Sequence, residues 1–135
     1  MNVVAPILIG LAYCALNSLV PERHRRPLNA VVVGGAGAAY LSGGGLGAGE
    51  LAFTTLMTYV AFRGLNSWTW IGAGWLLHSA WDVVHHVMGY PLLPFAPDSS
   101  FGCALCDPVI AVWCFAGGPS LNDIRRRFTR SAQVP

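Results

Sequence analysis

The sequence predicts an all-α integral membrane protein, built as a single-domain bundle of five transmembrane helices. Its composition is the first reason: hydrophobic residues make up 54% of the chain and charged residues only 10%, against about 25% charged in ordinary globular domains. The second is the division of its 135 residues into five apolar segments, and the third is the placement of its arginines between them. A chain of this length is expected to form one domain, and we expect it as a multi-pass protein of the cell membrane.

The expected spans are 3–20, 28–42, 49–64, 67–89 and 101–118, and residues 119–135 are expected to form a cytoplasmic tail. A helix needs about 20 residues to cross a bilayer, a length that the first, fourth and fifth segments offer. The second and third are shorter and are joined through the glycine-rich stretch SGGGLGAGE. The first segment has no positively charged residues ahead of its apolar run, so we expect a retained helix and not a cleaved signal peptide.

The basic residues are all arginines and fall into three groups. They are Arg23, Arg25 and Arg26, then Arg63, then Arg125, Arg126, Arg127 and Arg130. Basic residues near helix ends collect on the cytoplasmic side, and two apolar segments separate each group from the next. This parity predicts an outer N-terminus and an inner C-terminus. Nucleic acid is excluded as a partner because the arginines are few and lack interleaved stacking aromatics.

The fourth segment carries the polar stretch HSAWDVVHH. Each residue of an α-helix advances about 100°, so His78, Asp82, His85 and His86 fall within one stripe of roughly 100°. Ionisable groups in a membrane-spanning helix are expensive and usually functional. The predicted topology also brings Glu50, at the start of the third segment, to the same half of the bilayer as this stripe.

The fifth segment opens with FGCALCDP, which places Cys106 and Asp107 at the depth of the stripe. Cys103 and Cys106 are open to two interpretations, as a disulfide or redox pair in an oxidising compartment or as part of the polar site. Asp107 followed by Pro108 is typical of a helix start. We therefore expect the regular helix to begin at Pro108 after an irregular entry at 103–107, and capping is the alternative role for Asp107.

Two kinds of chemistry fit these residues. In the first, a divalent transition metal (zinc, iron or copper) is the cofactor, since imidazole, carboxylate and thiolate are its usual ligands. The candidate metal ligands are His78, Asp82, His85, His86, Cys106 and Asp107. In the second, Asp82, His78 and Glu50 are metal-free acid–base catalysts, facing an apolar pocket walled by Trp75, Trp81 and Trp113.

The sequence therefore predicts an enzyme acting on a lipophilic small molecule, by cyclase- or isomerase-like acid–base chemistry or by metal-dependent chemistry. A carrier of metal ions or protons is the alternative, and a structural or assembly subunit of the membrane is the third. The expected partners are the lipid bilayer and a lipophilic small molecule or metal ion. Small residues four apart in the glycine-rich second segment fit internal helix packing and, as the alternative, a homo-oligomer interface.

The stretches HSAWDVVHH and CALCDP together resemble a small, uncharacterised family of bacterial integral-membrane proteins. The resemblance covers most of the chain. It implies a helical membrane protein, and it carries over no activity and no functional residue. The residues proposed above therefore depend on their chemistry and spacing alone.

Overall fold

The computed structural model describes residues 2–43 and 45–131. Its regular elements in these residues are helices, joined by turns and loops, with one isolated β-bridge between Leu93 and Ala96. In chain order its elements are α1 (Val4–Ser18), α2 (Glu22–Gly37), the 3-10 helix η1 (Ala39–Ser42), α3 (Ala48–Gly64), α4 (Trp68–Met88), α5 (Ser99–Phe115) and α6 (Leu121–Ser131). Five of these helices overlap the five apolar segments of the sequence.

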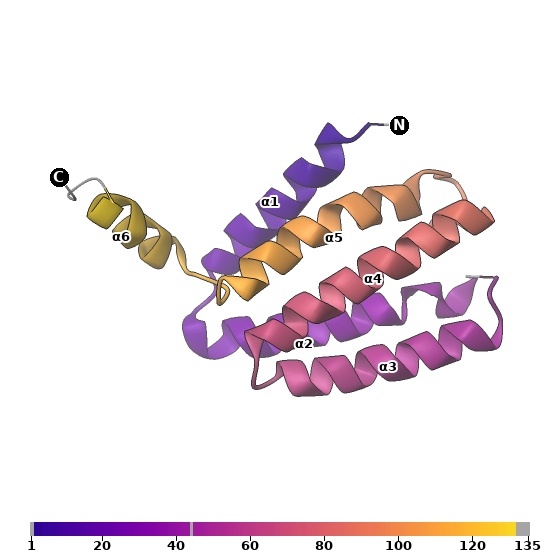
Figure 1. Cartoon of the computed structure of the whole chain (residues 1–135), viewed down its shortest axis with the longest axis horizontal. Coiled ribbons are helices and arrows are strands. Elements are labelled where there is room, and N and C mark those ends of the chain that lie inside the picture. The colour runs from indigo at the N-terminus through magenta and orange to yellow at the C-terminus, as the bar shows by residue number, and fades with distance from the viewer. Residues whose placement is uncertain (1, 44, 132–135) are drawn as a thin grey trace.

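Helix α4 lies in the middle of the bundle (Figure 1). It packs most extensively on α5 and also contacts α3 and α2, which pack on each other. Helix α1 packs on α5, and α6 projects from the end of α5 away from the other helices (Figure 1). This arrangement surrounds the polar stripe of α4 with α2, α3 and α5.

The prediction of a five-span membrane bundle is wrong. In residues 2–43 and 45–131, every helix is too short or too polar to cross a membrane. Helices α1, α2, α3 and α5 have 15, 16, 17 and 17 residues, fewer than the roughly 20 that a bilayer requires. Helix α4 has 21 residues, but its polar stripe breaks its apolar run. The expected cell-membrane localisation, and the inside–outside topology inferred from the arginines, are overturned by the same finding.

The helix α2 starts earlier than the sequence suggests, at Glu22 in place of residue 28. The first arginine group therefore belongs to its first turns and not to a connector. Arg25 turns inward and is only 5% exposed. Its guanidinium donates from Nε and Nη2 to the Val20 carbonyl, at 3.0 and 2.8 Å, and from Nη1 to the Gly118 carbonyl, at 2.9 Å. These bonds tie the α1–α2 corner to the connection between α5 and α6.

Helix α5 also starts earlier than predicted, at Ser99 and not at Pro108, and it continues through the proline. Proline has no backbone N–H, so Pro108 leaves the carbonyl of Ala104 without its helical donor. The hydroxyl of Ser79 on α4 donates to that carbonyl at 2.8 Å. The bond between helices replaces the missing helical bond, and residues 103–107 remain regular helix.

The core is formed by residues of α1 to α5 and includes the fully buried Val33, Met57 and Ile71. Gly37 allows α2 to approach α3, because a Cβ at this position would lie 2.2 Å from the Cβ of Met57. Gly34, on the same helix, is held against Ala61 of α3 in the same way. The close contact of α2 and α3 sets the position of η1, which completes the polar site described next.

Candidate metal centre

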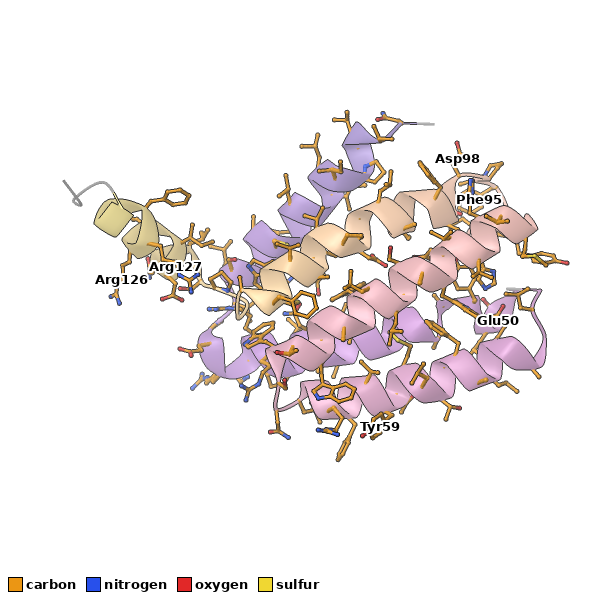
Figure 2. The ribbon with its side chains drawn as sticks, in the orientation of Figure 1. Glu50, Tyr59, Phe95, Asp98, Arg126 and Arg127 are labelled. Carbon is orange, nitrogen blue, oxygen red and sulfur yellow. The ribbon has the colours of Figure 1, made fainter. Side chains whose placement is uncertain are left out.

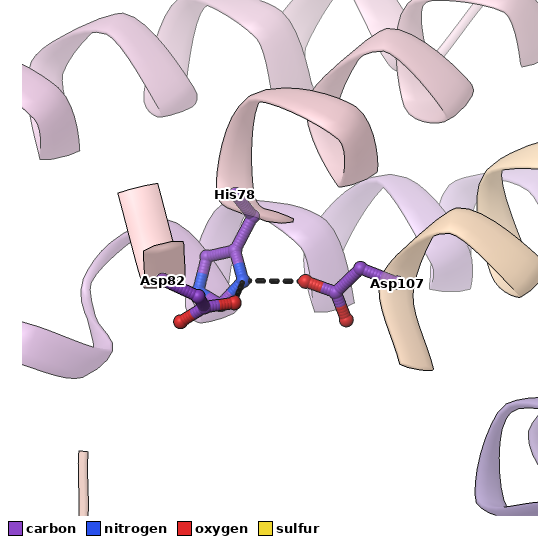
Figure 3. Close-up of side chains that lie close together, drawn as sticks. All are labelled: His78, Asp82 and Asp107. Atoms are coloured by element: carbon purple, nitrogen blue, oxygen red, sulfur yellow. Dashed lines mark hydrogen bonds and ion pairs between the residues drawn. The ribbon is translucent and has the colours of Figure 1, made fainter. Parts of the chain in front are cut away.

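Three of the predicted site residues meet between α4 and α5 (Figure 3). His78 and Asp82 lie one turn apart on α4, and Asp107 faces them from α5. The Nδ1 atom of His78 lies 2.7 Å from Oδ2 of Asp107 and 3.0 Å from Oδ2 of Asp82. The three side chains offer ligand atoms within 4.8 Å of one another, and the residues are 3%, 0% and 3% exposed.

The hydrogen bonds of His78 determine where its protons lie. Its Nε2 atom is 2.9 Å from the carbonyl oxygen of Ala36, and because a carbonyl only accepts, Nε2 carries a proton. Its Nδ1 atom faces two carboxylate oxygens, which are also acceptors. A proton or a metal ion must therefore lie between Nδ1 and these oxygens: a second ring proton, a proton on one of the carboxyl groups, or a metal ion.

The electrostatics of the metal-free centre favour the proton. Burial by itself would lower the pKa of His78, but the close contacts with Asp107 and Asp82 outweigh burial and raise this pKa to about 10. Burial raises the pKa of Asp107 to about 6, against the opposing effect of the nearby His78. An imidazolium beside two ionised carboxylates would carry one net negative charge in the core.

One ring proton cannot serve both carboxylates equally. The Nδ1–H of His78 is directed at Asp107, and Oδ2 of Asp82 has no hydrogen-bond partner among the residues that the structure describes. The 3.0 Å contact of Asp82 with the ring is thus an ion pair without hydrogen-bond geometry. A buried acceptor left unsatisfied costs about 1–3 kcal/mol, and more when it is charged.

The other oxygen of Asp82 is held by a chain of hydrogen bonds. The hydroxyl of Tyr40, from η1, donates to Asp82 Oδ1 at 2.6 Å and lies 2.6 Å from the hydroxyl of Ser100. Ser100 Oγ accepts the backbone N–H of Leu92 at 2.9 Å, so the Ser100 proton is directed to Tyr40. Burial, followed by the bond to Asp82, raises the pKa of Tyr40 far above its ordinary value. Tyr40 therefore remains a donor that fixes Asp82.

Glu50 and His85 form a second buried pair beside this centre. Nε2 of His85 lies 3.1 Å from Oε1 of Glu50, and Nδ1 lies 3.2 Å from the carbonyl of Tyr90. Oε2 of Glu50 accepts the indole N–H of Trp81 at 3.2 Å. Tyr40 links the two groups, since its ring stacks on that of His85 at a centroid distance of 3.6 Å. Glu50 and His85 thus lie next to the three-residue centre without contributing to its ligand set.

The remaining candidates lie outside both groups. His86 is half-buried, with its ring 5.2 Å from that of Phe101. Cys106 is half-buried and packs against the hydrophobic core. All four cysteines are free, including Cys103 and Cys106. Burial, reinforced by Asp82 and Asp107, raises the pKa of the Cys103 thiol to about 12, so this thiol stays protonated at neutral pH.

The three tryptophans predicted to wall one pocket lie in different surroundings in the structure. Trp75 meets His78 edge-on, at a ring-centroid distance of 6.3 Å. Trp81 stacks on Phe53 at 4.6 Å. The indole N–H of Trp113 donates to Ser18 on α1, so Trp113 packs on another face of α5.

Tyr40 and Ser100 belong to the site but were not among the residues predicted from the sequence. They lie 42 residues before and 18 residues after Asp82 along the chain, in segments with no distinctive spacing of polar residues. Tyr40 precedes the glycine-rich stretch, which is the only local sign that the chain turns back toward α4 there.

A comparison with protein families identifies the chain's relatives. The chain belongs to the family of unknown function DUF6010. The family model matches residues 1–120, which include every residue of the two buried groups, whereas α6 follows the matched region. The resemblance to an uncharacterised family is thereby confirmed, but its membrane character is not. No curated protein and no solved structure gives a significant match.

Proposed function

We propose that this protein binds a divalent transition-metal ion, with zinc as the best fit, through Nδ1 of His78 and the carboxylates of Asp82 and Asp107. The observation that carries the proposal is the buried Oδ2 of Asp82, which lies beside His78 without a hydrogen-bond partner in the described part of the chain. Imidazole nitrogen and carboxylate oxygen are common zinc ligands. The set comes from two helices that pack on each other over their length.

Charge supports the same proposal. A metal ion of charge +2, bound to one neutral imidazole and two carboxylates, leaves no net charge in the core. With a proton at Nδ1 and both carboxyl groups ionised, the centre would carry one negative charge, and buried charge is costly unless it is compensated. A metal would replace the single Nδ1 proton and satisfy all three donors together.

The surroundings of the ligands also fit a metal. Metal-binding histidines usually donate their other ring N–H to a backbone carbonyl or carboxylate, as His78 does to Ala36. Ligand carboxylates are themselves usually hydrogen-bonded, as Asp82 is to Tyr40. Ligands at about 2.0–2.2 Å from a tetrahedral ion lie roughly 3.3 Å apart, so the present contacts of 2.7 and 3.0 Å must open by about half an ångström.

Metal binding takes precedence over catalysis in this proposal because the centre is enclosed. Two surface cavities of about 600 and 550 Å³ are lined by residues of the α1–α2 corner with Trp68, and by residues of α1, α5 and α6. Neither is lined by His78, Asp82 or Asp107. The main effect of a metal ion held here would be to stabilise the contact between α4 and α5.

An acid–base enzyme is the second candidate function. The pKa of Asp107, raised to about 6 by burial, favours it because acid–base catalysts work best when their pKa lies near the operating pH. In this alternative, Asp107 and Asp82 exchange protons through His78. The metal content of the protein separates the two candidates, since acid–base chemistry needs no metal.

The test is zinc titration of metal-free protein by calorimetry, together with elemental analysis after purification. Wild-type protein should bind one zinc per chain, and Asp107→Asn and Asp82→Asn should each weaken binding at least tenfold. Asp98→Asn is the matched control, because Asp98 is exposed and outside the centre. Failure of the wild type to take up zinc, iron or copper would overturn the proposal, as would equal binding by all variants.

Thermal stability separates a metal site from an ion-pair centre that has only a structural role. Ligands that bind only the folded state raise its stability by mass action, by about 2.7 kcal/mol at a concentration 100 times Kd. Metal-dependent stabilisation should therefore appear when thermal unfolding is compared in zinc and in chelator. Identical midpoints in the two conditions would favour the structural centre over a metal site.

A further inference from the structure

An apolar groove lies between α1, α5 and α6, with a volume of about 550 Å³. This volume falls within the range of about 300–1,000 Å³ that is usual for small-molecule sites. The walls are formed mainly by Leu11 and Cys14 of α1, Val109, Val112 and Trp113 of α5, and Ile124 of α6. The groove and the candidate metal centre have no residue in common.

The polar atoms inside the groove are already paired within the protein. The indole N–H of Trp113 donates to Ser18 Oγ at 3.2 Å. Ser18 Oγ also lies 2.7 Å from the carbonyl of Cys14 and 2.9 Å from that of Pro119. The groove therefore presents almost only apolar surface, and a ligand lying in it needs a long apolar part.

The end of the groove at α6 is basic. Ile124 lines the groove and also a smaller adjoining cavity of about 190 Å³, whose other lining residues are Pro119, Arg127 and Phe128. Residues three and four apart are neighbours on a helix surface, so Arg127 and Phe128 flank Ile124. Figure 2 shows Arg126 and Arg127 on α6, at the opposite end of the molecule from Glu50. The apolar groove and the smaller cavity thus meet at Ile124, and Arg127 lines the smaller cavity.

We propose that the groove binds a long-chain fatty acid, with its hydrocarbon chain against α1 and α5 and its carboxylate at Arg127. The apolar walls match the chain, and the arginine matches the head, because a guanidinium forms strong, often bidentate hydrogen bonds with a carboxylate. Helix α6 supplies both Ile124 at the wall and Arg127 at the mouth. Its position at the end of α5 is thus part of the proposed site.

The experiment compares oleate with oleyl alcohol, which has the same chain and no charge, by calorimetry below their micellar concentrations. Wild-type protein should bind oleate at least tenfold more tightly than the alcohol. Arg127→Gln should remove this preference and leave binding of the alcohol unchanged. Arg125→Gln is the matched control, because Arg125 is exposed on the same helix and lines neither cavity.

A second variant tests the groove itself. Ala15→Trp places a large side chain in the groove from an exposed position on α1, and it should abolish binding of both ligands while circular dichroism remains that of the wild type. Unchanged binding in this variant would overturn the proposed site, and an Arg127→Gln variant that keeps the preference for oleate would overturn the assigned head contact. A second copy of the chain in the groove is the remaining outcome. It would appear as a concentration-dependent dimer that binds no oleate, and it too would overturn the proposal.

Discussion

Raising the pH should destabilise the metal-free protein because of His78. The pKa of this histidine is about 10 in the folded protein and 6.5 in the unfolded reference. Below pH 6.5 both states hold the proton, and the stabilisation by the two carboxylates is fully present. Between pH 6.5 and 10 only the folded state keeps it, so stability falls as the pH rises.

The magnitude follows from the same two values. One proton bound by the folded state and not by the unfolded state changes the free energy of unfolding by about 1.4 kcal/mol per pH unit. Burial raises the pKa of each of the four cysteines above its ordinary value of 9.0, which would add to the fall at higher pH. The measurement therefore stops at pH 8.5, where the expected loss relative to pH 6.5 is about 2 kcal/mol.

The assay is denaturant unfolding in a chelator at pH 6.5, 7.5 and 8.5, for the wild type and for His78→Gln. The difference between the two slopes isolates this histidine, because other groups titrate in both proteins. If the variant does not fold, nitrogen-15 chemical shifts of His78 in the wild type at pH 8 should show both ring nitrogens protonated. Parallel slopes, or a neutral His78 ring at pH 8, would refute the reasoning.

The remaining predictions concern the groups that support the centre. Tyr40→Phe removes the hydroxyl that donates to Asp82 and should weaken zinc binding about 10- to 100-fold. Competition with a chelating dye measures this affinity. An unaltered affinity would show that the bond from Tyr40 does not orient Asp82. Ser79→Ala leaves the Ala104 carbonyl without a donor and should destabilise the fold by about 1–3 kcal/mol, as measured by denaturant unfolding. The cost should shrink in a Pro108→Ala background, because alanine restores the helical N–H; an equal cost in both backgrounds would contradict this role for the serine.

Three residues of the candidate centre could be predicted from the sequence, whereas the membrane fold predicted from it was wrong. The helical spacing of His78 and Asp82 needed only the geometry of one helix, and the pairing of adjacent segments brought Asp107 opposite them. The membrane prediction failed because apolar composition was counted over segments that include helix ends and connectors. In the structure Leu19 and Val20, for example, follow the end of α1, which leaves that helix too short to span.

Other features depended on tertiary contacts that local patterns do not encode. Pro108 follows a typical capping residue, but the hydroxyl of Ser79, 29 residues away, allows the helix to continue through it. Arg25 belongs to a charged stretch, yet the carbonyl of Val20, five residues before it, and the carbonyl of Gly118, 93 residues after it, satisfy its guanidinium in the interior. Tyr40 reaches Asp82 because α2 packs closely on α3 at Gly37. In each case the partner lies in another helix or turn, where periodicity gives no information.

X-ray absorption spectroscopy at the zinc edge would show the ligands of the metal themselves. For zinc-loaded wild-type protein we expect a first shell of nitrogen and oxygen atoms at about 2.0–2.2 Å, with the outer-shell signature of one imidazole and no sulfur. A shell containing sulfur at about 2.3 Å would place the metal at the cysteines. That result, or a spectrum of hydrated zinc without an imidazole, would contradict the site at His78, Asp82 and Asp107.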